Sequence, residues 1–160
     1  MKHRLIIGLG IVSVALTGVA HAQQMRVPYG HTLTLDMAKK CVAAAEAESK
    51  KNNWNMAIAV VDASGQLVAF QKMDNTQNGS VQVAVEKART SNNFRRPTKA
   101  FEDAIAGGRN AILGLQGATP LEGGLPLVTD GKIIGAIGVS GELSGQDAQA
   151  AKACTDSLGK

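Results

Sequence analysis

The dipeptide Asp130-Gly131 separates two apolar runs, residues 125–129 and 132–140, and it constrains the fold more than any other feature of the chain. An Asp-Gly pair suits the two-residue turn that joins neighbouring antiparallel strands. A second pair of β-rich runs, residues 56–62 and 66–73, surrounds another glycine-containing turn. Two such hairpins predict an antiparallel sheet.

Helical spacing of apolar residues predicts four helices around these strands. They are expected over residues 35–51 with Thr34 as N-cap, over 80–92 with Ser80 as N-cap, from Pro97 to the glycines at 107–108, and from Ser144 to about Leu158. Ser144 and Asp147 have the spacing of a capping box at the start of the last helix. Residues 111–115 are expected to add a short strand, which gives the order α-β-β-α-α-β-β-β-α and helices packed on the sheet.

Small residues dominate the expected strand 132–140. Gly135, Ala136 and Gly138 are unusually small for a strand. A strand with glycine or alanine at such positions allows another backbone or a ligand to approach closely. The sequence therefore predicts close contact here with a helix or with a ligand.

The first 22 residues have the pattern of a secretory signal peptide. A basic start is followed by the uncharged apolar run 5–19 and by Ala20-His21-Ala22, a small-x-small cleavage pattern. A membrane anchor is the alternative, but the run is shorter than the ~20 apolar residues that a spanning helix needs. We expect a periplasmic or secreted bacterial protein, with residues 23–160 forming a single domain and no membrane insertion after cleavage.

Charge and aromatic content argue against a nucleic-acid partner. The formal net charge is +4, and it falls to +2 once Lys2 and Arg4 are removed. Only 3% of the residues are aromatic, whereas single-stranded nucleic acids are bound on clustered aromatic side chains.

The two cysteines, Cys41 and Cys154, lie on the first and the last expected helix. In an oxidising compartment they are expected to form a disulfide between these helices. The alternative is two separately buried thiols, since a free cysteine behaves as a small apolar residue.

Zinc and nucleotide sites are not expected. The chain after residue 22 contains one histidine, His31, and no CxxC motif, whereas a zinc site needs three or four suitably spaced ligands. The paired glycines at 107–108 and 123–124 lack the spacing of phosphate-binding loops.

Five segments in a fixed order resemble the GlcG/HbpS family, which includes the C-terminal domain of PduO-type proteins. They are VVDASGQLVAF (60–70), KMD (72–74), EKART (86–90), GGLPL (123–127) and DGKIIGAIGVSG (130–141), followed by Asp147. The resemblance covers about residues 33–158. It implies an α/β (α+β) fold of the profilin-like type, a three-layer sandwich with a five-stranded antiparallel sheet flanked by helices. It also implies a homo-oligomer.

The resemblance further implies binding of haem or a related tetrapyrrole, for uptake, storage or redox sensing. Two departures are visible: Gln66 stands where many members have histidine, and Lys72 where arginine is usual. The first removes a candidate ligand.

Candidate ligand-binding residues follow from these motifs and from the chemistry of haem. They are His31, Lys72, Met73, Asp74, Lys87, Thr90, Gly123, Gly124 and Pro126. Iron needs an axial donor, and His31 is the candidate imidazole, beside Tyr29, Met37, Met56, Met73 and the cysteines if these are unpaired. Lys72, Lys87 or Arg89 would pair with the haem carboxylates.

Two other functions stay open at this point. The chain is alternatively an enzyme or sensor for a small organic acid or aldehyde, in which Lys72, Lys87 and Thr90 bind a carboxylate and Asp74 or Glu122 acts as general base. In the third interpretation, it is a structural oligomer without a ligand.

Overall fold

The computed structural model describes residues 27–159, so the predicted signal peptide, residues 1–22, lies outside the described residues. The elements are α1 (Leu35–Lys51), β1 (Ala57–Asp62), β2 (Leu67–Lys72), α2 (Gly79–Phe94), α3 (Lys99–Ala106), the 3-10 helix η1 (Asn110–Gly114), β3 (Gly124–Thr129), β4 (Lys132–Ser140) and α4 (Ser144–Ser157). In this described part, no helix is both long and apolar enough to cross a membrane.

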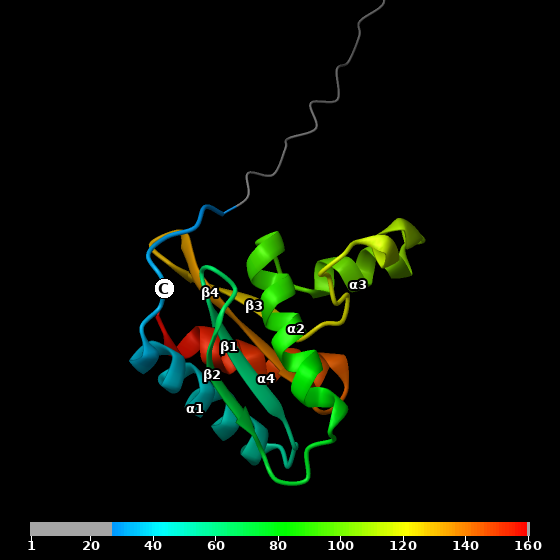
Figure 1. Ribbon diagram of the computed structural model, residues 1–160. Helices are drawn as coiled ribbons and strands as arrows, with labels where there is room; N and C mark the ends of the chain where they lie inside the picture. Colours follow the sequence, from blue (N-terminus) through cyan, green and yellow to red (C-terminus); the bar gives the residue numbers. More distant parts are fainter. Residues whose placement is uncertain (1–26, 160) are drawn as a thin grey trace, which may run out of the picture.

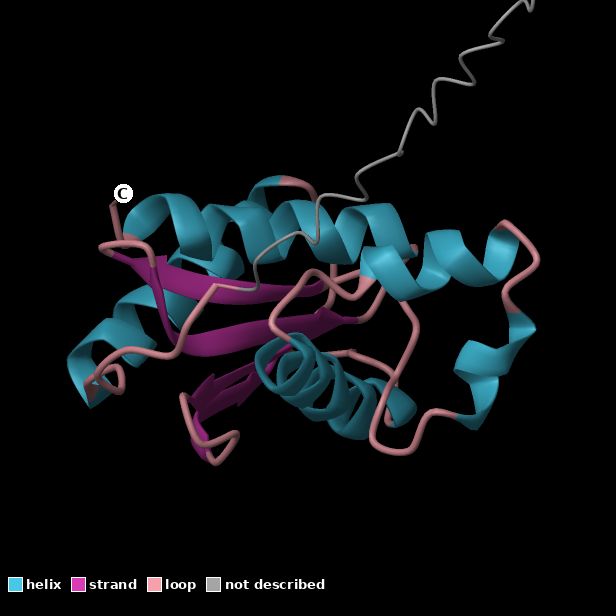
Figure 2. Cartoon of the chain, turned by 90° about the horizontal axis from the view of Figure 1, so that it is seen from above, coloured by secondary structure: helices cyan, strands magenta, loops and turns pink. Residues whose placement is uncertain are grey.

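The strands form one antiparallel sheet in the order β2-β1-β4-β3 (Figure 1). Helices α1 and α4 pack against one face, and α2 packs against the other on β1, β4 and β3. Figure 2 shows the sheet lying between these helices. The predicted three-layer α+β sandwich and both hairpins are confirmed.

The prediction of a fifth strand is wrong, because residues 110–114 form η1 instead. This segment has no buried residue, and Leu113 is 69% exposed. It contacts α3 and lies away from the sheet. The periodicity of so short an apolar run cannot distinguish a strand from a helical turn. Among the described residues, no strand pairs with this segment.

The predicted N-cap is confirmed for α1 and wrong for α2. The Thr34 hydroxyl accepts a hydrogen bond from Met37 N at 3.3 Å, as expected for an N-cap. Helix α2 instead begins at Gly79 without a side-chain cap, and the Ser80 hydroxyl lies 3.1 Å from that of Ser140. The Ser80 side chain, which the local sequence pattern assigns to helix capping, therefore makes a tertiary contact instead.

The two faces of the sheet carry side chains of different size. Towards α1 and α4, the strands present large residues, including Ile58, Val60 and Ile137. Towards α2 they present Ala57, Ala59, Val61 and Ala136, which pack against Ala84 and Ala88 of the helix. Small side chains on both surfaces let the α2 backbone lie close to the sheet.

Gly138 is the position of closest approach between β4 and α2. A Cβ atom there would overlap the carbonyl oxygen of Ala84 and the amide nitrogen of Ala88, both backbone atoms of α2. The close contact that the sequence predicts at this strand is therefore made by a helix.

A disulfide joins Cys41 of α1 to Cys154 of α4, as predicted. Both residues are fully buried, and 113 residues separate them in the sequence. Closing a loop of this length stabilises a fold by about 4–5 kcal/mol in the chain-entropy estimate. The bond links the two helices that cover the same face of the sheet.

Replacing Gly138 by alanine is expected to lower the free energy of unfolding by about 3 kcal/mol, because neither backbone can move without disturbing the sheet. Urea denaturation followed by circular dichroism measures the change. Gly145→Ala is the matched control: it lies in α4 with nothing within 4 Å of its added methyl group, and it should leave stability equal or slightly higher. Equal stability of the two variants would contradict the close packing of α2.

Candidate functional site

A buried ion pair lies where several of the family motifs meet. Lys87 of α2 is 2% exposed, and its Nζ lies 2.7 Å from Asp147 Oδ2 of α4. The same ammonium group donates a hydrogen bond to the Val139 carbonyl oxygen at 3.0 Å. Because α2 and α4 lie on opposite faces of the sheet, the pair connects the two helical layers.

Backbone amide groups complete the surroundings of Asp147. Its Oδ1 accepts a hydrogen bond from Glu142 N at 3.1 Å, and Gly141 provides a further backbone donor. Burial raises the pKa of the Asp147 carboxyl, while Lys87 and the backbone N–H groups act in the opposite direction. The carboxylate is thus bound on every side by protein atoms.

The predicted capping box of Ser144 and Asp147 is wrong. Helix α4 has Leu143 as N-cap residue, and Gln146 Oε1 accepts the hydrogen bond from Leu143 N at 3.1 Å. Asp147 turns inward instead, so sequence reasoning missed its role. A signal was available, because Asp147 shares the helical spacing of the buried Ala150, Ala151 and Cys154.

Gly123 and Gly124 surround this ion pair rather than an open cavity. Gly123 has φ +123°, and a Cβ there would lie 2.7 Å from the Val139 carbonyl oxygen and 2.9 Å from Lys87 Nζ. Gly124 N donates to the Thr98 hydroxyl at 2.9 Å. These two glycines make room for protein atoms of α2 and of the segment before α3.

Thr90 and Glu122, which the sequence proposes for carboxylate binding and base catalysis, take part in contacts within the protein. The Thr90 hydroxyl is buried and accepts a hydrogen bond from Thr119 N at 2.8 Å. Glu122 makes its contact through the backbone, where its N–H donates to Glu102 Oε2 at 2.6 Å. Both contacts hold the chain that returns from η1 to β3.

Lys72, Met73 and Asp74 lie elsewhere, in a shallow polar hollow of about 350 Å³ at the end of β2. Lys72 Nζ lies 3.0 Å from Asn78 Oδ1, and Met73 packs partly against the core. Lys87, Thr90 and Glu122 are not among the residues that line this hollow.

The candidate axial ligands are widely separated. His31 is exposed before α1, next to Thr32, whose hydroxyl accepts a hydrogen bond from Ala63 N beyond the end of β1. Met73 N donates to the Met56 carbonyl, just before the start of β1. His31 and Met73 therefore lie at opposite ends of this strand.

The other donors are occupied or buried. The Tyr29 hydroxyl donates to the Asn92 carbonyl at 2.7 Å, and Met56 is fully buried. Met37 is half-buried against the core, and both cysteines form the disulfide. Among residues 27–159, no cluster of three or more His, Cys, Asp or Glu side chains is placed to hold a metal ion.

A groove of about 410 Å³ with both apolar and polar lining runs between α1 and the edge strand β2. Its apolar walls are formed by Leu35, Val42, Ala43, Val68, Ala69 and Phe70, with Lys39, Glu46 and Gln71 as polar residues. Leu35 and Phe70 are 50% and 37% exposed, so the groove presents apolar surface to a ligand. His31 precedes Leu35 by four residues and is not among the residues that line the groove.

The charges of the groove differ in whether they are paired. Glu46 and Lys50 form an ion pair at 2.7 Å, and hydrogen bonds from Lys50 and Gln71 lower the pKa of Glu46. No ion pair of the described residues includes Lys39. The groove therefore combines apolar walls with a cation available for a ligand anion.

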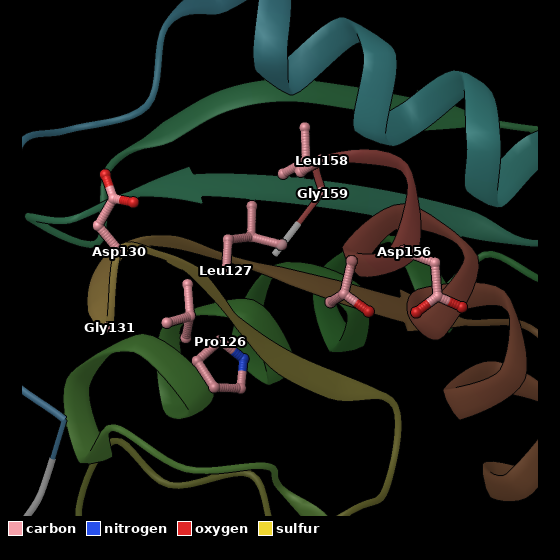
Figure 3. Close-up of a pocket in the computed structure, with 9 residues that line it drawn as sticks. Pro126, Leu127, Asp130, Gly131, Asp156, Leu158 and Gly159 are labelled. Carbon is pink, nitrogen blue, oxygen red and sulfur yellow. The ribbon is translucent and has the colours of Figure 1, made fainter.

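Pro126 lines a different hollow, of about 310 Å³, beside the other edge strand β3 (Figure 3). The nine sequence-proposed ligand residues are thus spread over several places in the fold.

Comparison with known proteins connects this fold with haem proteins. Residues 33–156 match a family model described as haem degrading protein HbpS-like. The protein GlcG of Escherichia coli K12 is 45% identical over 108 residues, which cover 68% of this chain and 81% of GlcG.

Solved structures are similar to this chain in fold. A double mutant of HbpS from Streptomyces reticuli has a TM-score of 0.75 at 27% identity, covering 95% of this chain and 100% of that chain. A PduOC–haem complex has a TM-score of 0.74 at 24% identity, covering 80% of this chain and 96% of that chain, and shows likeness of fold.

Replacing Lys87 by methionine is expected to cost about 3–5 kcal/mol of stability, since it leaves Asp147 buried without its cation. The pKa of Asp147 in the folded variant then lies above its ordinary value of 3.8, so the folded state binds its proton more tightly than the unfolded state does. The free energy of unfolding of Lys87→Met should therefore fall as the pH rises above about 4. Urea denaturation across pH measures this.

The double variant Lys87→Met/Asp147→Leu is the control for the buried charge. It should recover most of the lost stability and lose the added pH dependence, because no uncompensated charge stays in the interior. If the double variant were as unstable as the single one, the ion pair would not be the cause.

Proposed function

The chain belongs to the HbpS-like family, and from this premise we propose that it binds haem or a related tetrapyrrole in the groove between α1 and β2. The observation that carries the proposal is the combination of apolar walls with Lys39, which takes part in no ion pair of the described residues. A pocket with mostly apolar walls and a few placed polar groups is typical of cofactor sites.

The chemistry of the groove suits that of haem. The macrocycle is flat and apolar, so its faces gain free energy when Leu35, Val68 and Phe70 remove them from water. Its carboxylates need cations, and the Lys39 ammonium group lies on the groove wall. The His31 imidazole would supply the axial ligand to iron.

The descriptions of the matching family and of one similar solved structure support this proposal. The family description refers to haem degradation, and one structural neighbour is a complex with haem. The alternative, an acid-binding enzyme or sensor, needs Lys72, Lys87, Asp74 and Glu122 to act together. Because the Lys87 ammonium group is bound by Asp147 and Val139, the geometry gives that alternative less support.

We propose that the protein acts outside the cytoplasm, in the periplasm or after secretion. The Cys41–Cys154 disulfide supports this location, since such bonds persist in oxidising compartments. We also propose self-association. Leu67 on the edge strand β2 is 46% exposed and offers apolar surface for it.

Hemin titration of a groove-filling variant tests the location of the site. Ala43 is exposed on α1 and lines the groove, whereas Ala47, one turn later and also exposed, does not. Ala43→Trp should weaken hemin binding at least about tenfold, because the indole occupies the space of the ligand, and Ala47→Trp should bind as the unchanged protein does. The Soret band measures both. Equal affinities would place the site elsewhere, and no saturable shift with the unchanged protein would contradict haem binding.

His31→Ala tests the axial ligand separately. Loss of the imidazole should change the position and intensity of the Soret band, with a smaller loss of affinity, since the groove walls still hold the macrocycle. Added imidazole should restore the original spectrum. A His31→Ala spectrum identical to that of the unchanged protein would exclude His31 as the ligand.

A further inference from the structure

The hollow beside β3 lies between the β3–β4 turn and the end of α4. Figure 3 shows Asp130 on the turn at one side and Asp156 on α4 at the other, with Leu127 and Leu158 between them. The hollow has a volume of about 310 Å³, enough for a small organic molecule. It is formed at the edge strand opposite the one that borders the haem groove.

The charged groups that line this hollow, among the described residues, are acids. Asp130 and Asp156 are the ionisable residues of this lining, and no lysine or arginine within residues 27–159 contributes to it. Asp156 pairs with the exposed Lys152 at 2.6 Å. No ion pair of the described residues uses Asp130, so its carboxylate is available to a ligand.

The end of α4 adds to the negative potential. Thr155, Asp156 and Leu158 of the lining belong to the last turn of the helix and the residue after it. The carbonyl end of a helix carries a partial negative charge and binds cations favourably. Asp130 and the helix end therefore favour the same sign of ligand charge.

The floor of the hollow is apolar. Pro126, Val128 and Leu158 form its apolar surface, next to Leu127, which is 1% exposed and belongs to the core. Such a surface favours a hydrocarbon group, which gains free energy by leaving water. We propose that this hollow binds an organic ammonium ion with a short aliphatic body, its charge next to Asp130 and its body on Leu158.

Nuclear magnetic resonance titration with n-pentylammonium tests the proposal directly. The amide signals of Gly131 and Gly159, which line the hollow, should shift and saturate. Neutral 1-pentanol and the anion hexanoate carry the same pentyl chain. The alcohol should bind more weakly than the ammonium ion, and hexanoate should not bind. Equal shifts with all three compounds, or no saturable shift with the ammonium ion, would overturn the proposal.

Asp130→Asn removes the charge and keeps the fold, because asparagine tolerates the left-handed backbone at this position, φ +50°. The variant should bind n-pentylammonium about fivefold more weakly, as expected for an exposed ion pair. Asp103→Asn, an exposed acid on α3, is the matched control and should leave the affinity unchanged. Equal loss in both variants would mean that only the overall charge matters, which contradicts a defined site.

This site is independent of the proposed haem groove. Asp130→Asn should leave the hemin titration unchanged, and Ala43→Trp should leave the ammonium titration unchanged. Either proposal, haem in the groove or the ammonium ion in the hollow beside β3, can therefore be contradicted without affecting the other.

Discussion

The close approach of α2 to the sheet is the constraint on which the rest of the structure depends. Gly138 and the alanines of β1 and β4 leave no side-chain layer between the helix backbone and the strands. At this depth the side chain of Lys87 reaches past Gly123 to the Val139 carbonyl and to Asp147 of the opposite layer. A larger residue at either glycine would separate the groups of the ion pair. The packing of small residues and the buried charges thus form one unit.

The other face of the sheet is built in a different way. Large aliphatic side chains separate α1 and α4 from the strands, and the disulfide joins the two helices to each other. Helix α1 extends over β2, an edge strand of the sheet that the described residues form, and the groove lies between them. One face therefore provides a rigid, densely packed layer, and the other provides the surface on which we place the ligand. This division explains why the polar motifs of the sequence do not coincide with the groove.

Local patterns predicted most of the elements correctly. The Asp-Gly turn, the cap at Thr34 and the helical spacing of α1 depend on neighbours in the sequence, and the structure confirms them. Residues 111–115 were predicted wrongly, because a strand exists only where another strand pairs with it. Asp147 was interpreted as a cap for a similar reason: its local spacing fits a capping box, while its partner Lys87 lies 60 residues away.

By itself the sequence determined the antiparallel hairpins, the helices around them and the family, while the disulfide between Cys41 and Cys154 was one of two alternatives that the structure decided. These features follow from short-range spacing, from residue size and from ordered motifs. Only the tertiary structure decided which polar residues meet. It placed Lys87 and Asp147 in the interior, left Lys72 and Asp74 at the surface and brought α1 beside β2 to form a groove. The physical reason is that residues distant in sequence form the buried ion pair and the walls of the groove. The local periodicity of the sequence does not show which of these residues are in contact.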